Sequence, residues 1–224
     1  MPDAPLEPDY AANPNQRTPC VLVLDASTSM QGEPINHVNA GIEHFVDEVS
    51  QDTKARERLQ IAAICVGGPT PEAEVILDWT DAKDLQPFQL EAGHATPLGQ
   101  GVNRALDMVK DQTKELRENG VNCLRPWIVI MTDGQPNDSG WEQAAGRARE
   151  AQDDGKCVIF PLAVGDCRTD ILQLFATTPV KALDGYRFEE FFQWLSTSLR
   201  RVSTSGADDK VQMPATDPWE AVQT

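Results

Sequence analysis

Three oxygen-bearing side chains follow an apolar run near the start of the chain, at a spacing of two residues. The run Cys20–Leu24 is followed by Asp25, Ser27 and Ser29. In near-extended backbone alternate side chains point the same way, so one carboxylate and two hydroxyl groups can converge on one point. These hard oxygen ligands suit Mg²⁺, Mn²⁺ or Ca²⁺ better than zinc. The two serines also fit a helix cap or a tight turn, so the motif alone leaves both interpretations open.

Two further segments carry side chains of the same chemistry. Asp133 follows a second apolar run, Trp127–Met131, and Thr96 immediately precedes an expected helix. Ligands of doubly wound sheets bind beyond the carboxyl ends of the strands, where the strand order reverses. If the two strands are neighbours, Asp25 and Asp133 face the same crevice. Taken singly, Thr96 fits a helix N-cap and Asp133 a turn, but their combination with the first motif favours a metal site.

Alternating strand and helix patterns predict the elements that position these residues. Strands are expected over residues 20–24, 59–66, 75–79, 127–131 and 157–164, with a weak strand at 180–183. Helices are expected over residues 34–49, 97–116, 139–151, 171–175 and 188–202. The pattern predicts an α/β fold with a doubly wound, mostly parallel open sheet and helices on both faces.

Two connections in this arrangement have particular consequences. The link between the strands 59–66 and 75–79 is too short for a crossover, so we expect the second of them to be an antiparallel edge strand. Pro161 lies within an expected strand and cannot donate to the ladder, so we expect a bulge or a missing bond there.

The length of 224 residues fits one folded domain with additional terminal segments. We expect an N-terminal extension over residues 1–18, the domain over 19–202, and an acidic, flexible or docked C-terminal tail over 203–224. Trp219 is the one aromatic residue of this tail. It fits an anchor onto the domain itself or a contact to a partner, and the sequence leaves both open.

The net charge of −16 argues against nucleic acids and anionic membrane surfaces as partners. No apolar run approaches the roughly 18 residues of a membrane-spanning helix, and the N-terminal segment lacks the pattern of a secretory signal. The five cysteines form no CxxC pair. These features predict a cytoplasmic, reduced protein without a disulfide framework.

The motif Asp25-x-Ser27-x-Ser29, followed by Thr96 and Asp133, resembles the metal-ion-dependent adhesion site of von Willebrand factor A (vWA) domains. The resemblance spans roughly residues 19–202 and implies the vWA, Rossmann-like fold. Within that superfamily the chain is similar to the bacterial TerY-like branch, which is associated with tellurium resistance. The segment Ala-Thr-Pro-Leu-Gly around Thr96 and the short acidic tail carry this second similarity.

The resemblance implies a role for each residue of the motif. Ser27 and Ser29 would bind the metal directly, and Thr96 directly or through water. Asp25 and Asp133 would act mostly through water and orient the serines. Neutral hydroxyl ligands leave the cation under-compensated, so it can accept a Glu or Asp carboxylate of a protein partner. The branch is often associated with a protein kinase and a PP2C-like phosphatase, which implies a bacterial stress-response or phosphorylation-linked assembly.

An enzyme is the second class of function to weigh. A haloacid-dehalogenase-like phosphohydrolase also has an Asp after its first strand, but its general acid/base stands two positions later, where this chain has Ser27. Nucleophile-elbow and phosphate-loop motifs are absent from the sequence. We therefore expect no enzymatic activity. We also expect His37 and His44 to be exposed on a helix, and His94 to lie at the rim of the site.

Overall fold

Six strands form one sheet in the order β3-β2-β1-β4-β5-β6. The computed structural model describes residues 13, 15–185, 187–205, 211–216 and 220. The strands are β1 (Thr18–Ala26), β2 (Leu59–Gly67), β3 (Ala73–Asp81), β4 (Trp127–Thr132), β5 (Val158–Ala163) and β6 (Lys181–Ala182). Neighbouring strands are parallel except β2 and β3, which confirms the expected antiparallel edge strand. Every residue of β1, β2 and β4 is buried, which explains their nearly continuous apolar sequences.

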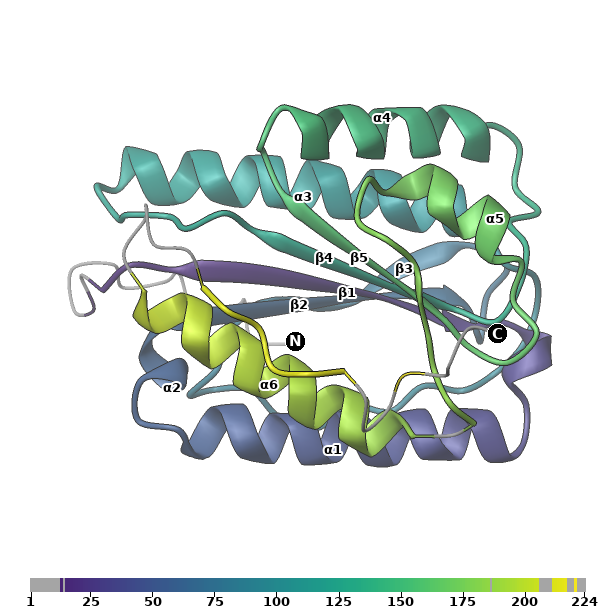
Figure 1. Ribbon diagram of the computed structural model, residues 1–224, viewed down its shortest axis with the longest axis horizontal. Coiled ribbons are helices and arrows are strands. Elements are labelled where there is room, and N and C mark those ends of the chain that lie inside the picture. Colours follow the sequence, from purple (N-terminus) through teal and green to yellow (C-terminus); the bar gives the residue numbers. More distant parts are fainter. Residues whose placement is uncertain (1–12, 14, 186, 206–210, 217–219, 221–224) are drawn as a thin grey trace, which may run out of the picture.

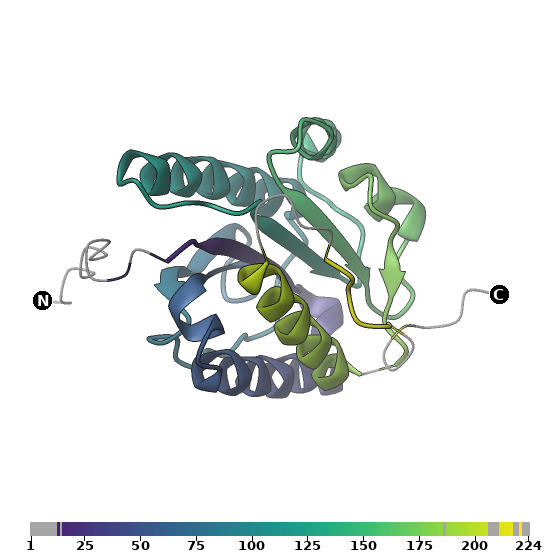
Figure 2. The same ribbon diagram turned by 60° about the vertical axis from the view of Figure 1, so that its left-hand side comes forward.

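Helices cover both faces of this sheet, as the alternating pattern predicts (Figures 1 and 2). They are α1 (Glu33–Gln51), α2 (Ala55–Arg58), α3 (Leu98–Glu118), α4 (Trp141–Asp153), α5 (Thr169–Leu172) and α6 (Phe188–Thr204). Two 3₁₀ turns, Thr28–Met30 and Gln173–Phe175, complete the list. The helices α1, α2 and α6 lie on one face, and α3, α4 and α5 lie on the other (Figure 2).

Side chains of β1 alternate between two separate apolar cores. Leu22 and Leu24 belong to the core under α1 and α6, whereas Val21 and Val23 belong to the core under α3 and α4. The first core is rich in phenylalanine. The second is built on small residues of α4, and a Cβ atom at Gly99 of α3 would lie 2.6 Å from the Cα atom of Trp141. The helices α3 and α4 therefore pack closely, as the small residues of α4 suggest.

Neither the bulge nor the missing bond expected at Pro161 occurs in the pairing of β5 with β4. The pairing of β5 with β4 runs without a register shift, and Pro161 lies opposite Ile130. Val158 N and Val164 N both donate toward the β4 side, to Pro126 O at 2.8 Å and Thr132 O at 2.9 Å. Backbone N–H groups of a strand alternate between its two neighbours, so the odd-numbered residues of β5 direct theirs toward β6. Pro161 is one of them, and its missing N–H therefore concerns the β6 side. The short β6 pairs only with Leu162 and Ala163, so the β4–β5 ladder loses no bond.

The described part of the C-terminal tail packs back onto the domain. Trp194 Nε1 donates to Pro214 O at 3.0 Å, and Met213 packs against the core under α1 and α6. Lys181 Nζ lies 2.9 Å from Glu220 Oε1, and Glu220 forms an antiparallel bridge with Leu183. Trp219 itself lies outside the described residues. Within the described ranges no helix is long and apolar enough to cross a membrane.

Candidate metal site

The carboxyl ends of β1 and β4 lie side by side at one edge of the sheet. The two strands pair in parallel, with Leu24 opposite Met131. The chain order reverses between them, because β2 and β3 lie on one side and β5 and β6 on the other. Open α/β sheets bind ligands at this position. The structure therefore provides the neighbouring strands that a shared crevice for Asp25 and Asp133 requires.

Asp25 forms the buried base of the candidate site. Its Oδ1 atom accepts a hydrogen bond from Ser27 N at 2.8 Å, and its Oδ2 atom accepts one from Thr132 Oγ1. Burial raises the pKa of Asp25, and the charge of Asp133 adds to this, whereas hydrogen bonds from Thr132 and Ser27 oppose the rise. Gly134 N donates to Thr132 Oγ1 at 3.1 Å and fixes that hydroxyl. A bound divalent cation would favour the ionised carboxylate in this environment.

The two serines connect the loop after β1 to the loop after β4. Ser27 Oγ lies 3.1 Å from Ser29 Oγ, and Ser29 Oγ donates to Asp133 Oδ1 at 2.7 Å. Ser27 is buried and Ser29 is exposed, so this chain of oxygen atoms runs from the interior to the surface. Asp133 is half-buried, and burial raises its pKa although the hydrogen bond from Ser29 opposes the rise.

Thr96 approaches the same group of atoms from a third loop. A Cβ atom at Gly134 would lie 3.3 Å from Thr96 Oγ1 and 3.8 Å from Asp25 Oδ2, so the threonine hydroxyl borders the space beside the carboxylate. Thr96 is not the N-cap of α3, because Pro97 occupies that position. The backbone of Thr96 is held by reciprocal bonds of 3.1 Å, from Thr96 N to Asn137 Oδ1 and from Asn137 N to Thr96 O.

The loop that carries Thr96 is tied to the end of β1. Gly93 N donates to Ala26 O at 2.8 Å, and His94 O accepts from Thr28 N at 3.1 Å and from Thr28 Oγ1 at 2.8 Å. His94 has a φ angle of +59°, and its side chain is exposed beside the site. His37 and His44 are exposed on α1, as expected. These bonds fix the loop through its backbone and leave the His94 side chain at the surface.

The five predicted residues thus lie at one edge of the sheet, and their chemistry is distinctive. Three are alcohols and two are carboxylic acids. Across the described residues, no group of three or more His, Cys, Asp or Glu side chains could hold a metal ion. The donor set therefore fits a hard cation such as Mg²⁺, Mn²⁺ or Ca²⁺ and does not fit zinc.

Sequence reasoning missed two residues that shape the site, one at the end of β4 and one in the loop that follows it. Thr132 ends the apolar run of β4, and its hydroxyl holds Asp25. Asp138 caps α3, because its carboxylate accepts from Gly99 N at 3.1 Å and Gln100 N at 2.9 Å. A polar residue at the end of a buried strand was a usable signal for Thr132. The role of Asp138 depends on two loops that meet only in the fold.

Cys167 is a third neighbour that the sequence did not indicate. Its thiol lies 3.8 Å from Gly134 O. Burial, together with the charges of Asp133 and Asp25, raises the pKa of Cys167 to about 12. The group therefore stays a neutral thiol near neutral pH. The five cysteines of the chain are all free thiols.

Comparisons with known proteins agree with this architecture. The chain matches the family model of the von Willebrand factor type A domain over residues 20–196. None of the curated proteins compared with the chain matches it in sequence.

Several solved structures share the fold at low identity. The pilus adhesin SpaC of Lactobacillus rhamnosus GG, in its open conformation, has a TM-score of 0.65 and 15% identity over 84% of this chain and 31% of that chain. The vWF domain of the pili tip protein Mfa5 from Porphyromonas gingivalis has a TM-score of 0.59 and 13% identity over 81% and 95% of the two chains. The manganese-loaded TRAP protein of Plasmodium vivax has a TM-score of 0.54 and 14% identity over 81% and 74%. This chain spans about a third of the SpaC chain, and at these identities the likeness shows the fold alone.

Proposed function

The chain belongs to the von Willebrand factor type A domain family, and we propose on that premise that it is a metal-dependent protein-interaction module. Domains of this family commonly serve in adhesion and protein interaction and are typically not enzymes. The observation that carries the proposal is the linked set of oxygen atoms at the switch point. Ser27, Ser29 and Asp133 form one hydrogen-bonded chain above the buried Asp25.

In this proposal Ser27, Ser29 and Thr96 hold a divalent cation through their hydroxyl groups. Asp25 and Asp133 act mostly through water and orient the serines, which is supported by the bonds from Ser27 N to Asp25 and from Ser29 Oγ to Asp133. The cation is Mg²⁺, with Mn²⁺ or Ca²⁺ as substitutes. When bound, it supplies an electrophilic position for one further anionic oxygen.

The partner ligand in this proposal is a Glu or Asp carboxylate of another protein. Hydroxyl ligands add no charge, so the cation keeps an attraction for that carboxylate. The net charge of −16 opposes an acidic partner at long range, but physiological salt screens this repulsion beyond about 8 Å. Recognition therefore depends on the metal and on the loops around it.

We further propose that the chain acts in the cytoplasm in a bacterial stress-response assembly of the TerY-like, tellurium-resistance type, beside a protein kinase and a PP2C-like phosphatase. The segment around Thr96 and the acidic tail support this assignment. We take residues 19–202 as the interaction domain, with residues 1–18 and 203–224 as its extensions.

Calorimetric titration with Mg²⁺ and with Mn²⁺ tests the site. We expect saturable binding by the wild-type chain and none by the double variant Ser27→Ala and Ser29→Ala. Ser139→Ala is the matched control, because Ser139 is an exposed serine of the loop after β4. Circular dichroism verifies that each variant is folded. Equal binding by the double variant and the control would contradict the assignment.

The geometry does not favour a haloacid-dehalogenase-like phosphohydrolase. Ser27 occupies the position of the required general acid/base, and its hydroxyl is engaged with Ser29. A phosphatase assay with a generic substrate checks this. If the wild-type chain turned over the substrate and Asp25→Asn did not, the phosphohydrolase would be favoured over the interaction module.

A further inference from the structure

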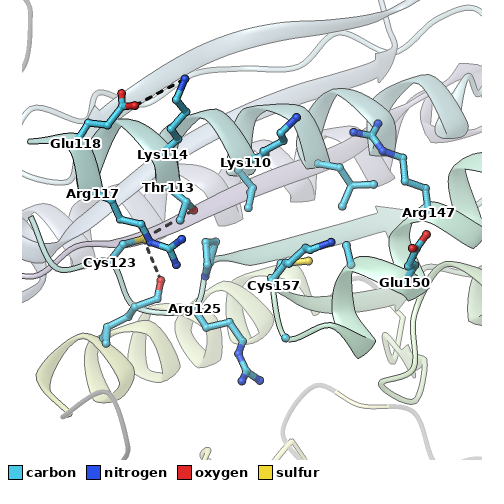
Figure 3. A pocket seen from close by; sticks show the side chains of 17 residues that line it. Lys110, Thr113, Lys114, Arg117, Glu118, Cys123, Arg125, Arg147, Glu150 and Cys157 are labelled. Atoms are coloured by element: carbon cyan, nitrogen blue, oxygen red, sulfur yellow. Dashed lines mark hydrogen bonds and ion pairs between the residues drawn. The ribbon is translucent and has the colours of Figure 1, made fainter.

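The amino edge of the sheet holds a pocket of about 820 Å³ between α3 and α4 (Figure 3). Its walls come from the C-terminal halves of both helices and from the segments that lead into β4 and β5. The candidate metal site lies at the opposite, carboxyl edge of the sheet, at the ends of β1 and β4. The pocket is therefore a second surface, separate from that site.

Basic side chains dominate the pocket. Six of them line it: Lys110, Lys114, Arg117, Arg125, Arg147 and Lys156. Two carboxylates, Glu118 and Glu150, also line it, and Asp107 and Asp154 pair with two of the cations, which leaves an excess of two positive charges. The whole chain has 19 basic residues against 35 acidic ones. A local excess of positive charge in so acidic a chain indicates a surface that attracts anions.

Three of these cations are already paired at the surface. Lys114 Nζ lies 3.8 Å from Glu118 Oε1, and Lys156 Nζ lies 2.8 Å from Asp154 Oδ2. Arg147 bonds Asp107 of α3.

The other three have no ion-pair partner among the residues that the structure describes: Lys110, Arg117 and Arg125. Figure 3 shows Lys110 and Arg117 along α3, with Arg125 across the pocket from them. These three exposed side chains are available to an external anion.

The floor of the pocket is apolar. Leu106 and Val109 of α3, Leu124 of the following loop and Cys157 before β5 are buried and line it. A ligand that only carried charge would leave this floor unused. An apolar side chain flanked by acidic groups would use both the floor and the cationic rim.

The geometry distinguishes among classes of anion. The cations are spread over two helices and two connecting segments, so they do not converge on one compact phosphate group. Both helices end at the pocket, so neither supplies the backbone N–H groups with which a helix N-terminus binds a compact phosphate. A long nucleic acid would extend beyond the pocket and be repelled by the rest of the chain, whose net charge is −16. A short segment within about one Debye length, about 8 Å, meets mainly the local cations.

We propose that this pocket binds a short acidic segment of a partner protein, with apolar side chains on the floor and carboxylates at Lys110, Arg117 and Arg125. The binding requires no metal, so it is independent of the carboxylate proposed for the metal site. A partner that contacts both surfaces would be held at the two opposite edges of one sheet.

Fluorescence anisotropy of the full chain in EDTA tests this proposal. The probe is a fluorescein-labelled peptide of about ten residues, composed of Asp, Glu and Leu. A second peptide with Asn and Gln in place of the acids tests the role of charge. We expect saturable binding of the acidic peptide only, at least tenfold weaker for the double variant Arg117→Glu and Arg125→Glu. Amide NMR shifts should concentrate on residues 106–125 and 147–157.

The matched control is the double variant Arg104→Glu and Lys83→Glu. Both residues are exposed and neither lines the pocket, so the net charge changes equally. We expect less than a twofold change in the affinity of the acidic peptide for this variant. Equal loss in both variants, no saturable binding, or equal binding of the amide peptide would overturn the proposal. The proposal would also be overturned if tripolyphosphate or a single-stranded oligonucleotide displaced the labelled peptide more strongly than the unlabelled acidic peptide does. That result would indicate another class of anion as the ligand.

Discussion

At the carboxyl edge of the sheet the polar side chains satisfy one another, whereas at the amino edge three cations have no ion-pair partner among the described residues. Asp25, Ser27, Ser29 and Asp133 are linked through hydrogen bonds of 2.7–3.1 Å. Crossover helices of a parallel sheet begin at its carboxyl edge and end at its amino edge. Helix N-termini favour acidic groups and C-termini favour basic ones. The polarity of the fold thus separates the two kinds of charge between the two edges.

The largest effect should follow from filling the space between Thr96 and Asp25. We expect Gly134→Val to abolish Mg²⁺ and Mn²⁺ binding in calorimetry, because a Cβ atom there already lies 3.3 Å from Thr96 Oγ1 and 3.8 Å from Asp25 Oδ2. Gly146→Val is the control, since a Cβ atom there has no neighbour within 4 Å. If Gly134→Val retained binding, the cation would not occupy the space between Thr96 and Asp25. Acidic-peptide binding at the amino edge should be unchanged in both variants.

A smaller effect is expected from Thr132→Val. The variant leaves Asp25 Oδ2 and Gly134 N without the threonine hydroxyl, which should cost about 1–3 kcal/mol of unfolding free energy in urea denaturation. The hydrogen bond from Thr132 lowers the pKa of Asp25, so its loss raises that pKa further. Metal binding should then weaken at a higher pH than in the wild type. Thr132→Ser keeps the hydroxyl and should behave like the wild type in both measurements; if it matched the valine variant, packing rather than the hydroxyl would be responsible.

Asp52 is a carboxylate away from the metal site, and its contribution to the stability of the protein depends on the groups that contact it. Its Oδ1 atom accepts from Ala55 N at 2.7 Å and Lys54 N at 3.0 Å, and Arg200 Nη1 lies 3.6 Å from Oδ2. Burial raises the pKa of Asp52, but these backbone bonds and Arg200 outweigh it and lower the pKa overall.

We expect Asp52→Ala to cost about 1 kcal/mol near neutral pH, the usual value for a side chain that accepts hydrogen bonds from backbone N–H groups at the start of a helix, here from Lys54 N and Ala55 N beside α2. Because the pKa of Asp52 is lower in the folded than in the unfolded chain, its ionised carboxylate stabilises the fold at pH values above the ordinary pKa of aspartic acid. This contribution is lost as the pH falls through the lower, folded pKa. The wild type and the variant should therefore begin to converge in stability as the pH falls below about 4, the ordinary pKa of aspartic acid. A difference that stays constant down to pH 2 would assign the effect to the lost contacts rather than to ionisation.

The smallest expected effect concerns the independence of the two edges. Arg117→Glu with Arg125→Glu should change the affinity for Mg²⁺ by less than twofold in calorimetry. Both residues precede Trp127, which pairs with Cys20 at the far end of β1 from Asp25. Five residues of strand span about 16 Å, which exceeds the screening length of about 8 Å. A larger change would couple the two surfaces and weaken the separation that the fold suggests.

Much of this architecture could be predicted from sequence, because strands buried on both faces are read as continuous apolar runs. The runs of β1 and β4 gave Asp25 and Asp133 their place at strand ends. Their adjacency could not be derived, because pairing order depends on long-range packing. Element ends differ from those expected: α6 continues to Thr204, two residues beyond the expected end, and β5 begins at Val158, one residue after the expected start.

The amino-edge pocket illustrates a second limit of sequence reasoning. Lys110, Lys114 and Arg117 recur at helical spacing and are visible as one face of a helix. Nothing in their order shows that Arg125 and Arg147 will face the same space. That requires the close packing of α3 on α4, which depends on the small residues between the two helices.

The bridge between Leu183 and Glu220 has a consequence for how copies of this chain behave in concentrated solution. Beyond β6, a strand of two residues, Glu220 occupies a bridging position that a foreign strand could otherwise take. At the far border, β3 is nine residues long, with exposed Val75 and Ile76 between the acidic Glu74 and Asp78. Edge charges of this kind oppose strand-to-strand polymerisation. The two borders of the sheet thus oppose self-assembly by different means. A bridge to Glu220 occupies the border beside β6, and charge repulsion acts at β3.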